Sequence, residues 1–178
     1  MFGRRRRKPP ASLRPALERN ERVLAWARSA DDPSQAVVVT TLGLWLPGRG
    51  RLGWHQIHKA TWSGSRLTVV PSHPVGDGVA DEGSAYTVMA DDTAISVTLS
   101  DPGDVPATVR QRVTKSVAYT AHHPLPSGGV RVVARRVAGV NGVTWHVRYD
   151  EGTDETDPAV VAVTGEFVGQ AAAPMRPE

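Results

Sequence analysis

Cysteine is absent from the 178 residues, which excludes disulfide bridges, thiolate metal sites and a cysteine nucleophile. This absence is compatible with a reducing cytosol. No apolar run approaches the roughly 20 residues that a membrane-spanning helix needs. The N-terminus, MFGRRRRKPP, also lacks the apolar stretch of a secretory signal. We therefore expect a cytoplasmic protein that is not transmembrane.

The sequence also has little that suggests catalysis or a cofactor. It contains no HExxH, GxSxG, phosphate-loop or strand-GxGxxG-helix motif. A general acid needs a fixed, partly desolvated carboxyl, whereas the paired carboxylates lie in stretches typical of flexible loops. These pairs are Asp31-Asp32, Asp81-Glu82 and Asp91-Asp92. We expect no catalytic residue and no cofactor, with a small-molecule enzyme as the weakest alternative.

The histidine pairs do not form an obvious metal site either. His55 and His58 are three residues apart on a predicted strand, so their rings should point to opposite faces. His122 and His123 come at the predicted end of a helix, where an imidazolium suits the helix dipole. We therefore expect no metal.

Positive charge is concentrated at the N-terminus. The net charge is +3, but residues 1–10 carry five positive charges, so the other 168 residues sum to −2. Residues 1–20 are predicted to be a disordered basic tail, because adjacent charges repel and prolines resist helix formation. One interpretation is an arm for anionic lipid or nucleic acid, and the other is a solvated terminus. The arm consists of Arg4, Arg5, Arg6, Arg7 and Lys8.

Residues 36–71 dominate the fold prediction, because they read as four short strands separated by turns of Gly, Pro and Ser. The strands are expected at residues 37–41, 43–46, 54–62 and 66–70, with a turn at residues 47–50. A further strand is expected within residues 21–30. Leu44 and Leu46 should share one face of their strand, with Trp45 on the other. Trp45, Trp54 and Trp62 could form a ligand platform, although packing in or beside the core is the commoner use of tryptophan. The pattern predicts a curled antiparallel sheet.

Residues 72–100 are predicted to hold a long loop, 72–85, and then a hairpin of strands 86–90 and 94–100. A helix should begin at Asp104 and end near His123, with Pro106 in its first turn. Its apolar stripe recurs every four residues and should cover the curled sheet. The stripe consists of Val105, Val109, Val113 and Val117.

Residues 127–150 are predicted to form a second hairpin around the two-residue turn Asn141-Gly142. One face of it carries a candidate binding surface for a partner protein. This surface consists of Arg131, Arg135, Arg136, His146 and Arg148. The alternative is a solvated face whose arginines pair with Glu151, Asp154, Glu155 and Asp157. A second helix is expected from Asp157-Pro158, with Gly165 and Gly169 weakening it.

Several short motifs resemble those of bacterial pleckstrin-homology-like domains. Glu21-Arg22-Val23-Leu24 is similar to their first strand, and Val38-Val39-Thr40 leads into Leu44-Trp45 as in that family. Trp54-His55-Gln56-Ile57 and the helix from Asp104 continue the likeness over residues 21–121. The chain as a whole also resembles a group of actinobacterial proteins, a likeness that implies no particular activity. The first resemblance implies a sharply bent seven-stranded sheet capped by one helix, with function carried by loops.

Together these patterns predict an α+β protein. Residues 1–20 are the tail, 21–123 the PH-like β-barrel or sandwich with its capping C-terminal helix, 124–173 an added hairpin and helix, and 174–178 a short tail. We expect a non-enzymatic binding or adaptor module whose partner is another protein. The alternative is a binder of anionic surfaces, either lipid head groups or nucleic acid, through the basic arm. Homo-oligomerisation remains open.

Overall fold

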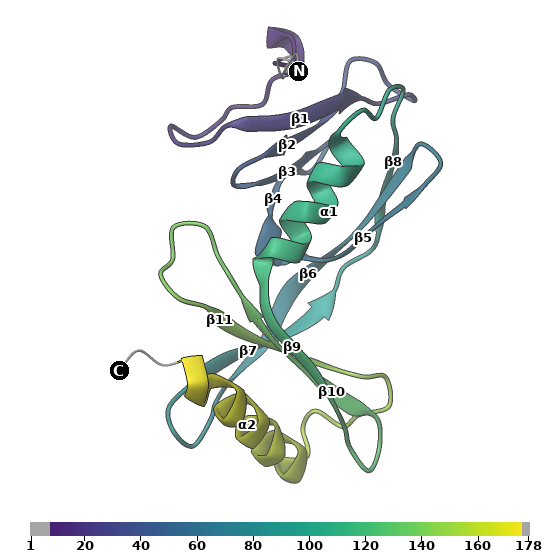
Figure 1. Cartoon of the computed structure of the whole chain (residues 1–178). Coiled ribbons are helices and arrows are strands. Elements are labelled where there is room, and N and C mark those ends of the chain that lie inside the picture. Colours follow the sequence, from purple (N-terminus) through teal and green to yellow (C-terminus); the bar gives the residue numbers. More distant parts are fainter. Residues whose placement is uncertain (1–7, 176–178) are drawn as a thin grey trace. The chain divides into compact units, whose positions relative to one another are not determined.

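The structure is a computed structural model that describes residues 8–175 (Figure 1). It is a mixed α+β protein with two sheets and two α-helices, and most of its regular elements are strands. The described chain divides into two compact units, which we treat separately. Unit 1 comprises Met1–Pro71 and Asp92–Ser116, and unit 2 comprises Ser72–Asp91 and Val117–Glu178.

Unit 1 contains a four-stranded antiparallel sheet in the order β1-β2-β3-β4 and three further strands, in which β6 pairs with both β5 and β8. The strands are β1 Val23–Arg28, β2 Ala36–Thr40, β3 Gly43–Leu46, β4 Gly50–Gly53, β5 Ile57–Ser63, the first part of β6 Arg66–Val79, and β8 Ile95–Thr98. An isolated bridge between Ser29 and Leu99 links the end of β1 to the residue after β8. This bridge brings an edge of the four-stranded sheet to the second group of strands, so the sheet of unit 1 curls.

Alternation along the strands sends one set of side chains of unit 1 inward. Val37 and Val39 of β2 and Leu44 of β3 are fully buried in one core cluster. Helix α1, Val105–Ser116, adds Val105 and Val109 to the same cluster. The helix lies beside the strands of unit 1 (Figure 1). Burial of apolar side chains from both the strands and α1 is the main favourable term in folding this unit.

Two predictions within residues 47–62 need correction. Gly50, predicted to belong to a turn, begins strand β4, and Trp54–Gln56 is a 3₁₀ turn rather than the start of a strand. β4 pairs with β3 from Gly43↔Gly53 to Leu46↔Gly50. Gly43 must be glycine, because a Cβ atom there would lie 2.2 Å from the Leu52 carbonyl oxygen.

Helix α1 ends at Ser116, earlier than predicted, and Val117–Pro124 forms strand β9. The valine stripe therefore belongs to α1 at three positions, and Val117 lies in a strand. Residues such as Val117 and Tyr119 favour strands. Pairing of β9 with β10 then outweighs the four-residue spacing that suggested a longer helix.

Unit 2 is an open sheet in the order β6-β7-β11-β10-β9 with one helix, α2. Its elements are the second part of β6, β7 Ala85–Asp91, β9 Val117–Pro124, β10 Gly129–Arg135, β11 Thr144–Tyr149 and α2 Pro158–Ala172. Neighbouring strands are antiparallel except for β7 and β11, which pair in parallel. Val130, Val132 and Val147 are fully buried and form a core with Val168 of α2.

The predicted loop over residues 72–85 is wrong for residues 72–79, which complete β6 and pair with β7, and only residues 80–84 connect the two strands. The glycines that suggested a loop instead allow close packing. A Cβ atom on Gly78 would lie 2.2 Å from the Tyr86 ring, and Tyr86 is buried in the core of unit 2. The predicted 86–100 hairpin is also wrong, because β7 pairs with β6 and β11 whereas β8 pairs with β6 in unit 1.

The second hairpin and the second helix are confirmed, with differences in detail. β10 and β11 pair from Val130↔Tyr149 to Arg135↔Thr144, so the connection is residues 136–143 rather than the two-residue turn. The Asp157 carboxylate accepts a hydrogen bond from Ala159 N at 2.9 Å and caps α2, with Pro158 in the first turn. Gly165, expected to weaken α2, belongs to its buried face.

Candidate functional site

A row of side chains crosses the outer face of the four-stranded sheet. Strand register places Trp26 of β1 opposite Val38 of β2, Val38 opposite Trp45 of β3, and Trp45 opposite Arg51 of β4. Residues adjacent to Val38 point into the core, so Val38 and its cross-strand neighbours lie on the other face. We call these four residues the outer-face row.

Residues 8–20 cover part of the outer-face row. The sequence predicts a disordered tail here, whereas the structure places Leu13 in a buried position, 9% exposed. A 3₁₀ turn at Ala11–Leu13 sets the path of the segment, and Arg14 donates a hydrogen bond to the Pro9 carbonyl at 3.2 Å. We call residues 8–20 the covering segment.

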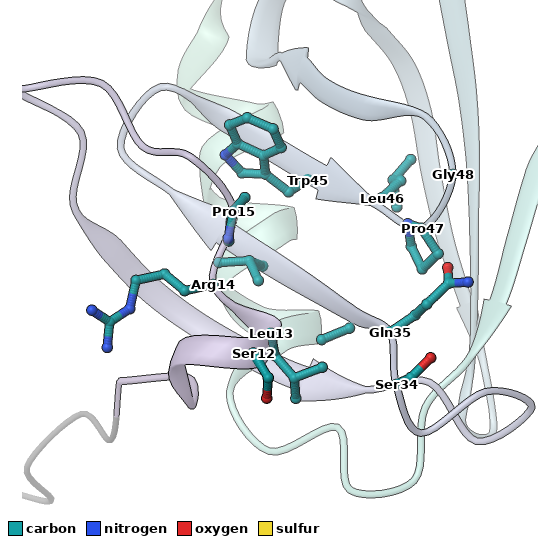
Figure 2. Close-up of a pocket in the computed structure, with 12 residues that line it drawn as sticks. Ser12, Leu13, Arg14, Pro15, Ser34, Gln35, Trp45, Leu46, Pro47 and Gly48 are labelled. Atoms are coloured by element: carbon teal, nitrogen blue, oxygen red, sulfur yellow. The ribbon is translucent and has the colours of Figure 1, made fainter.

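A hollow of about 320 Å³ remains between the covering segment and the sheet (Figure 2). Leu13 and Pro15 form one side of it, and Trp45 and Pro47 contribute apolar surface from the sheet. Gln35 stands at the rim, and Figure 2 shows Arg14 extending away from the hollow. Ser12, Ser34 and Gln35 contribute polar surface, so the walls are of mixed polar and apolar character.

Glu21 anchors the end of the covering segment and the edge of Trp45. Its side chain is fully buried and both carboxylate oxygens are used. Oε1 accepts from Thr40 Oγ1 at 2.5 Å and from Trp45 Nε1 at 2.9 Å. Oε2 accepts from Arg51 Nη1 at 2.7 Å and from Glu18 N at 3.1 Å. Because the Glu21 carboxylate is fixed by these donors, its hydrogen bond with Trp45 Nε1 holds the indole ring in one orientation.

The pKa of Glu21 reflects this environment. Burial alone would raise the pKa of the carboxyl above its ordinary value of 4.5. Hydrogen bonds from Thr40 and Trp45, together with the Arg51 charge, outweigh burial and lower the pKa. Glu21 therefore remains an anion at neutral pH, although it is buried.

Arg51 joins the carboxylates to the ring of Trp45. It donates to Glu18 Oε1 at 2.5 Å as well as to Glu21, and the hydrogen bond to Glu18 is the main cause that raises its pKa. Its guanidinium carbon lies 5.8 Å from the centroid of the Trp45 ring, within the range of a cation–π contact. Glu18 is 61% exposed and Arg51 26% exposed, so this end of the covering segment meets solvent.

The structure separates the five residues of the predicted cationic surface by exposure. Arg131 and Arg136 are exposed, His146 and Arg148 are half-buried, and Arg135 is buried at 6% exposure. Burial, followed by the charge of Arg148, lowers the pKa of Arg135. Arg131 lies opposite Arg148 in the β10–β11 register. The binding role of these residues stays a prediction.

Arg148 makes an ion pair outside the acidic run of the alternative interpretation, and that interpretation stays a prediction for the other arginines. Arg148 forms an ion pair with Asp91 of β7, and Arg136 donates to the Val117 carbonyl at 3.4 Å. The acidic run instead makes local contacts, since Asp154 accepts from Thr156 and Asp157 caps α2. Of the basic arm, Arg4, Arg5, Arg6 and Arg7 lie outside the described residues. Lys8 is described and is exposed.

His55, His122 and His123 occupy other elements than the sequence suggests, whereas His58 lies in a strand as predicted. His55 lies in the 3₁₀ turn and His58 in β5. His122 and His123 lie in β9, where His122 Nε2 is 2.7 Å from an Asp150 oxygen and His123 stacks on Phe167 at 3.9 Å between ring centroids. Within residues 8–175, no group of three or more His, Cys, Asp or Glu side chains is placed to hold a metal ion.

Comparison of the chain with protein-family models, curated proteins and solved structures finds no match. Among the helices of the described part of the chain, none is long and apolar enough to cross a membrane.

Sequence reasoning found part of this site and missed the rest. It placed Trp45 on the face opposite Leu44, and that prediction is confirmed by the burial of Leu44 in the core. It missed Glu21 and Leu13. Leu13 and Leu17 are apolar residues within a basic tail, and this was the available signal for a packed segment. Glu21 gave no signal, because its partners come from distant parts of the sequence.

Proposed function

We propose that this protein is a non-enzymatic binding module that engages another protein through the outer face of its four-stranded sheet, around Trp45. The observation that carries the proposal is the hollow beside Trp45. Its walls combine polar and apolar groups, and Trp45 is a rigid aromatic residue at its side. Tryptophan residues fixed in such positions supply much of the binding energy at protein interfaces.

The anchoring of Trp45 favours recognition over a purely structural role. Its indole N–H is bound to Glu21 and its ring is approached by Arg51, so the side chain does not have to be ordered when a partner binds. A side chain that is already ordered loses little conformational entropy on association. The half-buried ring therefore offers contact area at low entropic cost.

We also propose that the scaffold is PH-like. This is supported by the order of elements in unit 1, where four strands are followed by three further strands and then by α1. Residues 72–91 are then an insertion between the sixth and seventh strands of the scaffold. In such a fold the function is set by local surfaces rather than by the architecture.

The test is a selection of random peptides against the full chain, repeated with two variants. Gln35→Tyr adds a ring at the rim of the hollow, and Thr61→Tyr adds the same ring at an exposed position of β5. Peptides selected by the wild-type chain should bind Gln35→Tyr at least about tenfold more weakly and Thr61→Tyr unchanged, since tenfold corresponds to about 1.4 kcal/mol. Selected peptides that bind both variants as well as the wild type would contradict the proposal.

Binding of anionic surfaces by Arg4–Lys8 stays a prediction with a separate test. Replacement of these five basic residues by serine should abolish binding to vesicles rich in anionic lipid or to nucleic acid, and the wild-type binding should fall steeply with salt. Peptide binding at Trp45 should survive the same replacement.

A further inference from the structure

The covering segment shows what kind of chain the outer face accepts. Residues 8–20 read KPPASLRPALERN, with three prolines and two leucines. Pro9 and Leu13 are the residues of this stretch that are buried. The segment therefore sits on the sheet as a ligand would, with a few apolar residues against the surface and the others in solvent.

The two residues that flank the 3₁₀ turn of the covering segment, Pro10 and Arg14, have extended backbone near the polyproline II region. Pro10 has φ −52° and ψ 152°, and Arg14 has φ −85° and ψ 120°. Ideal polyproline II has φ near −75° and ψ near 145°. Proline-containing segments in this conformation dock in aromatic-lined grooves, because their backbone is already ordered before binding.

The covering segment is joined to the sheet by the ion pair of Glu18 near its C-terminal end and by the buried side chain of Leu13 in its middle. Glu21 is a fixed end, since its carboxylate is buried and fully hydrogen-bonded. Upstream of it, the ion pair between Glu18 and Arg51 is partly exposed, and ion pairs of this kind contribute little. Backbone hydrogen bonds of Leu13 and Arg14 go to Pro10 and Ala11 within the segment itself. Departure of residues 8–18 from the sheet breaks the Glu18 N hydrogen bond to Glu21 and the Glu18–Arg51 ion pair, and it leaves the contacts of Glu21 with Thr40 and Trp45 in place.

We propose that the partner of the outer face is an extended segment containing proline and leucine, and that residues 8–18 of the chain occupy the same face in cis and compete with it. This inference rests on the proposed function. The hollow between Pro15 and Pro47 provides the first contact for the incoming segment. Displacement of Leu13 then opens the rest of the outer-face row.

The experiment measures binding of a synthetic peptide, KPPASLRPALERN, to the full chain and to Leu13→Ser. Loss of the buried leucine weakens the cis contact, so the peptide should bind Leu13→Ser at least about tenfold more tightly than the wild type. A peptide with alanine at its three proline positions should bind more weakly. Adding Gln35→Tyr to Leu13→Ser should reverse the gain.

Leu13 is outside the core cluster of unit 1, so Leu13→Ser should fold. Glu18→Gln provides a second test, because it removes an exposed contact of the covering segment and should raise peptide affinity by a smaller factor. Equal affinity of the peptide for the wild type and both variants would overturn the inference. If Gln35→Tyr still weakened the binding of peptides selected from the library, the proposed function would stand. If those peptides bound Gln35→Tyr as tightly as the wild type, the proposed function itself would be overturned.

Discussion

Replacement of Glu21 by glutamine should strongly destabilise unit 1, although the two side chains have the same shape. Two donors, Thr40 and Trp45, face one carboxylate oxygen, and two donors, Arg51 and the Glu18 amide, face the other. A glutamine has one acceptor oxygen and a nitrogen that only donates. In either orientation of the amide, two donors would therefore meet a third donor in a buried site.

The size of the effect follows from the burial of the carboxylate. Removing one partner of a buried ion pair costs about 3–5 kcal/mol. Arg51 is 26% exposed and keeps its contact with Glu18, which reduces the loss. We expect Glu21→Gln to lower the free energy of unfolding by about 3 kcal/mol, a value within the range for leaving buried donors unpaired.

Urea unfolding followed by tryptophan fluorescence measures this change, with Glu18→Gln as the matched control. Glu18 binds the same arginine from a position that is 61% exposed, so its replacement should cost less than about 1 kcal/mol. A loss below about 0.5 kcal/mol for Glu21→Gln, as at an ordinary surface position, would refute the reasoning about the buried carboxylate.

The same carboxylate predicts a dependence on pH. The pKa of Glu21 in the folded protein is below the ordinary value of 4.5, so its contribution to stability is present above that value. The contribution is lost as the pH falls through the lowered pKa, because the folded state must then take up a proton. The difference in stability between wild type and Glu21→Gln should shrink in that acidic range and stay constant between pH 6 and 8.

Three further predictions concern packing and capping, and thermal and urea unfolding test each of them. Val109→Ala in α1 should cost about 2 kcal/mol because Val109 is 2% exposed in the core of unit 1, and a loss near zero would mean that α1 does not cover it. Gly165→Ala should stabilise α2 by about 0.5–1 kcal/mol, since its Cβ would make an ordinary contact with Ala80 at 3.5 Å; destabilisation would show that the packing is tighter. Asp157→Ala should cost about 1 kcal/mol, and Asp157→Ser, which can still cap the helix, should recover most of it.

Local patterns predicted the elements whose partners are close in sequence. The run of β-branched residues that begins at Val37 identified β2, and the spacing of Val105 and Val109 identified the buried face of α1. The Asp157-Pro158 pair marked the start of α2 correctly. In each case the signal and the structure it specifies lie within a few residues.

Elements that depend on distant partners were missed for that reason. Residues 72–79 have the composition of a loop, yet they form a strand because β7 supplies the hydrogen bonds and Tyr86 needs the space beside Gly78. Val117 continues the four-residue spacing of the helix before it, yet residues 117–124 form strand β9 because they pair with β10. Long-range pairing of this kind overrides local propensity.

The part of the candidate site around Glu21 and Leu13 was missed for the same physical reason. The partners of Glu21 are 19, 24 and 30 residues away in the chain, and they converge only when β1 to β4 are in register. The burial of Leu13 could not be predicted either, because a leucine in a basic, proline-containing stretch has no local pattern that identifies the surface it covers. Tertiary register, rather than composition, creates the outer face.

The five tryptophans provide the most direct test of binding at this face. Trp26 and Trp45 lie in the outer-face row, Trp54 and Trp62 pack in or against the core of unit 1, and Trp145 lies in the core of unit 2. Their indole N–H signals can be followed by NMR while a peptide selected by the wild-type chain is added. We predict a saturable shift of the Trp45 signal with Trp145 unchanged. A shift of Trp145 while Trp45 stays in place would contradict binding at the outer face.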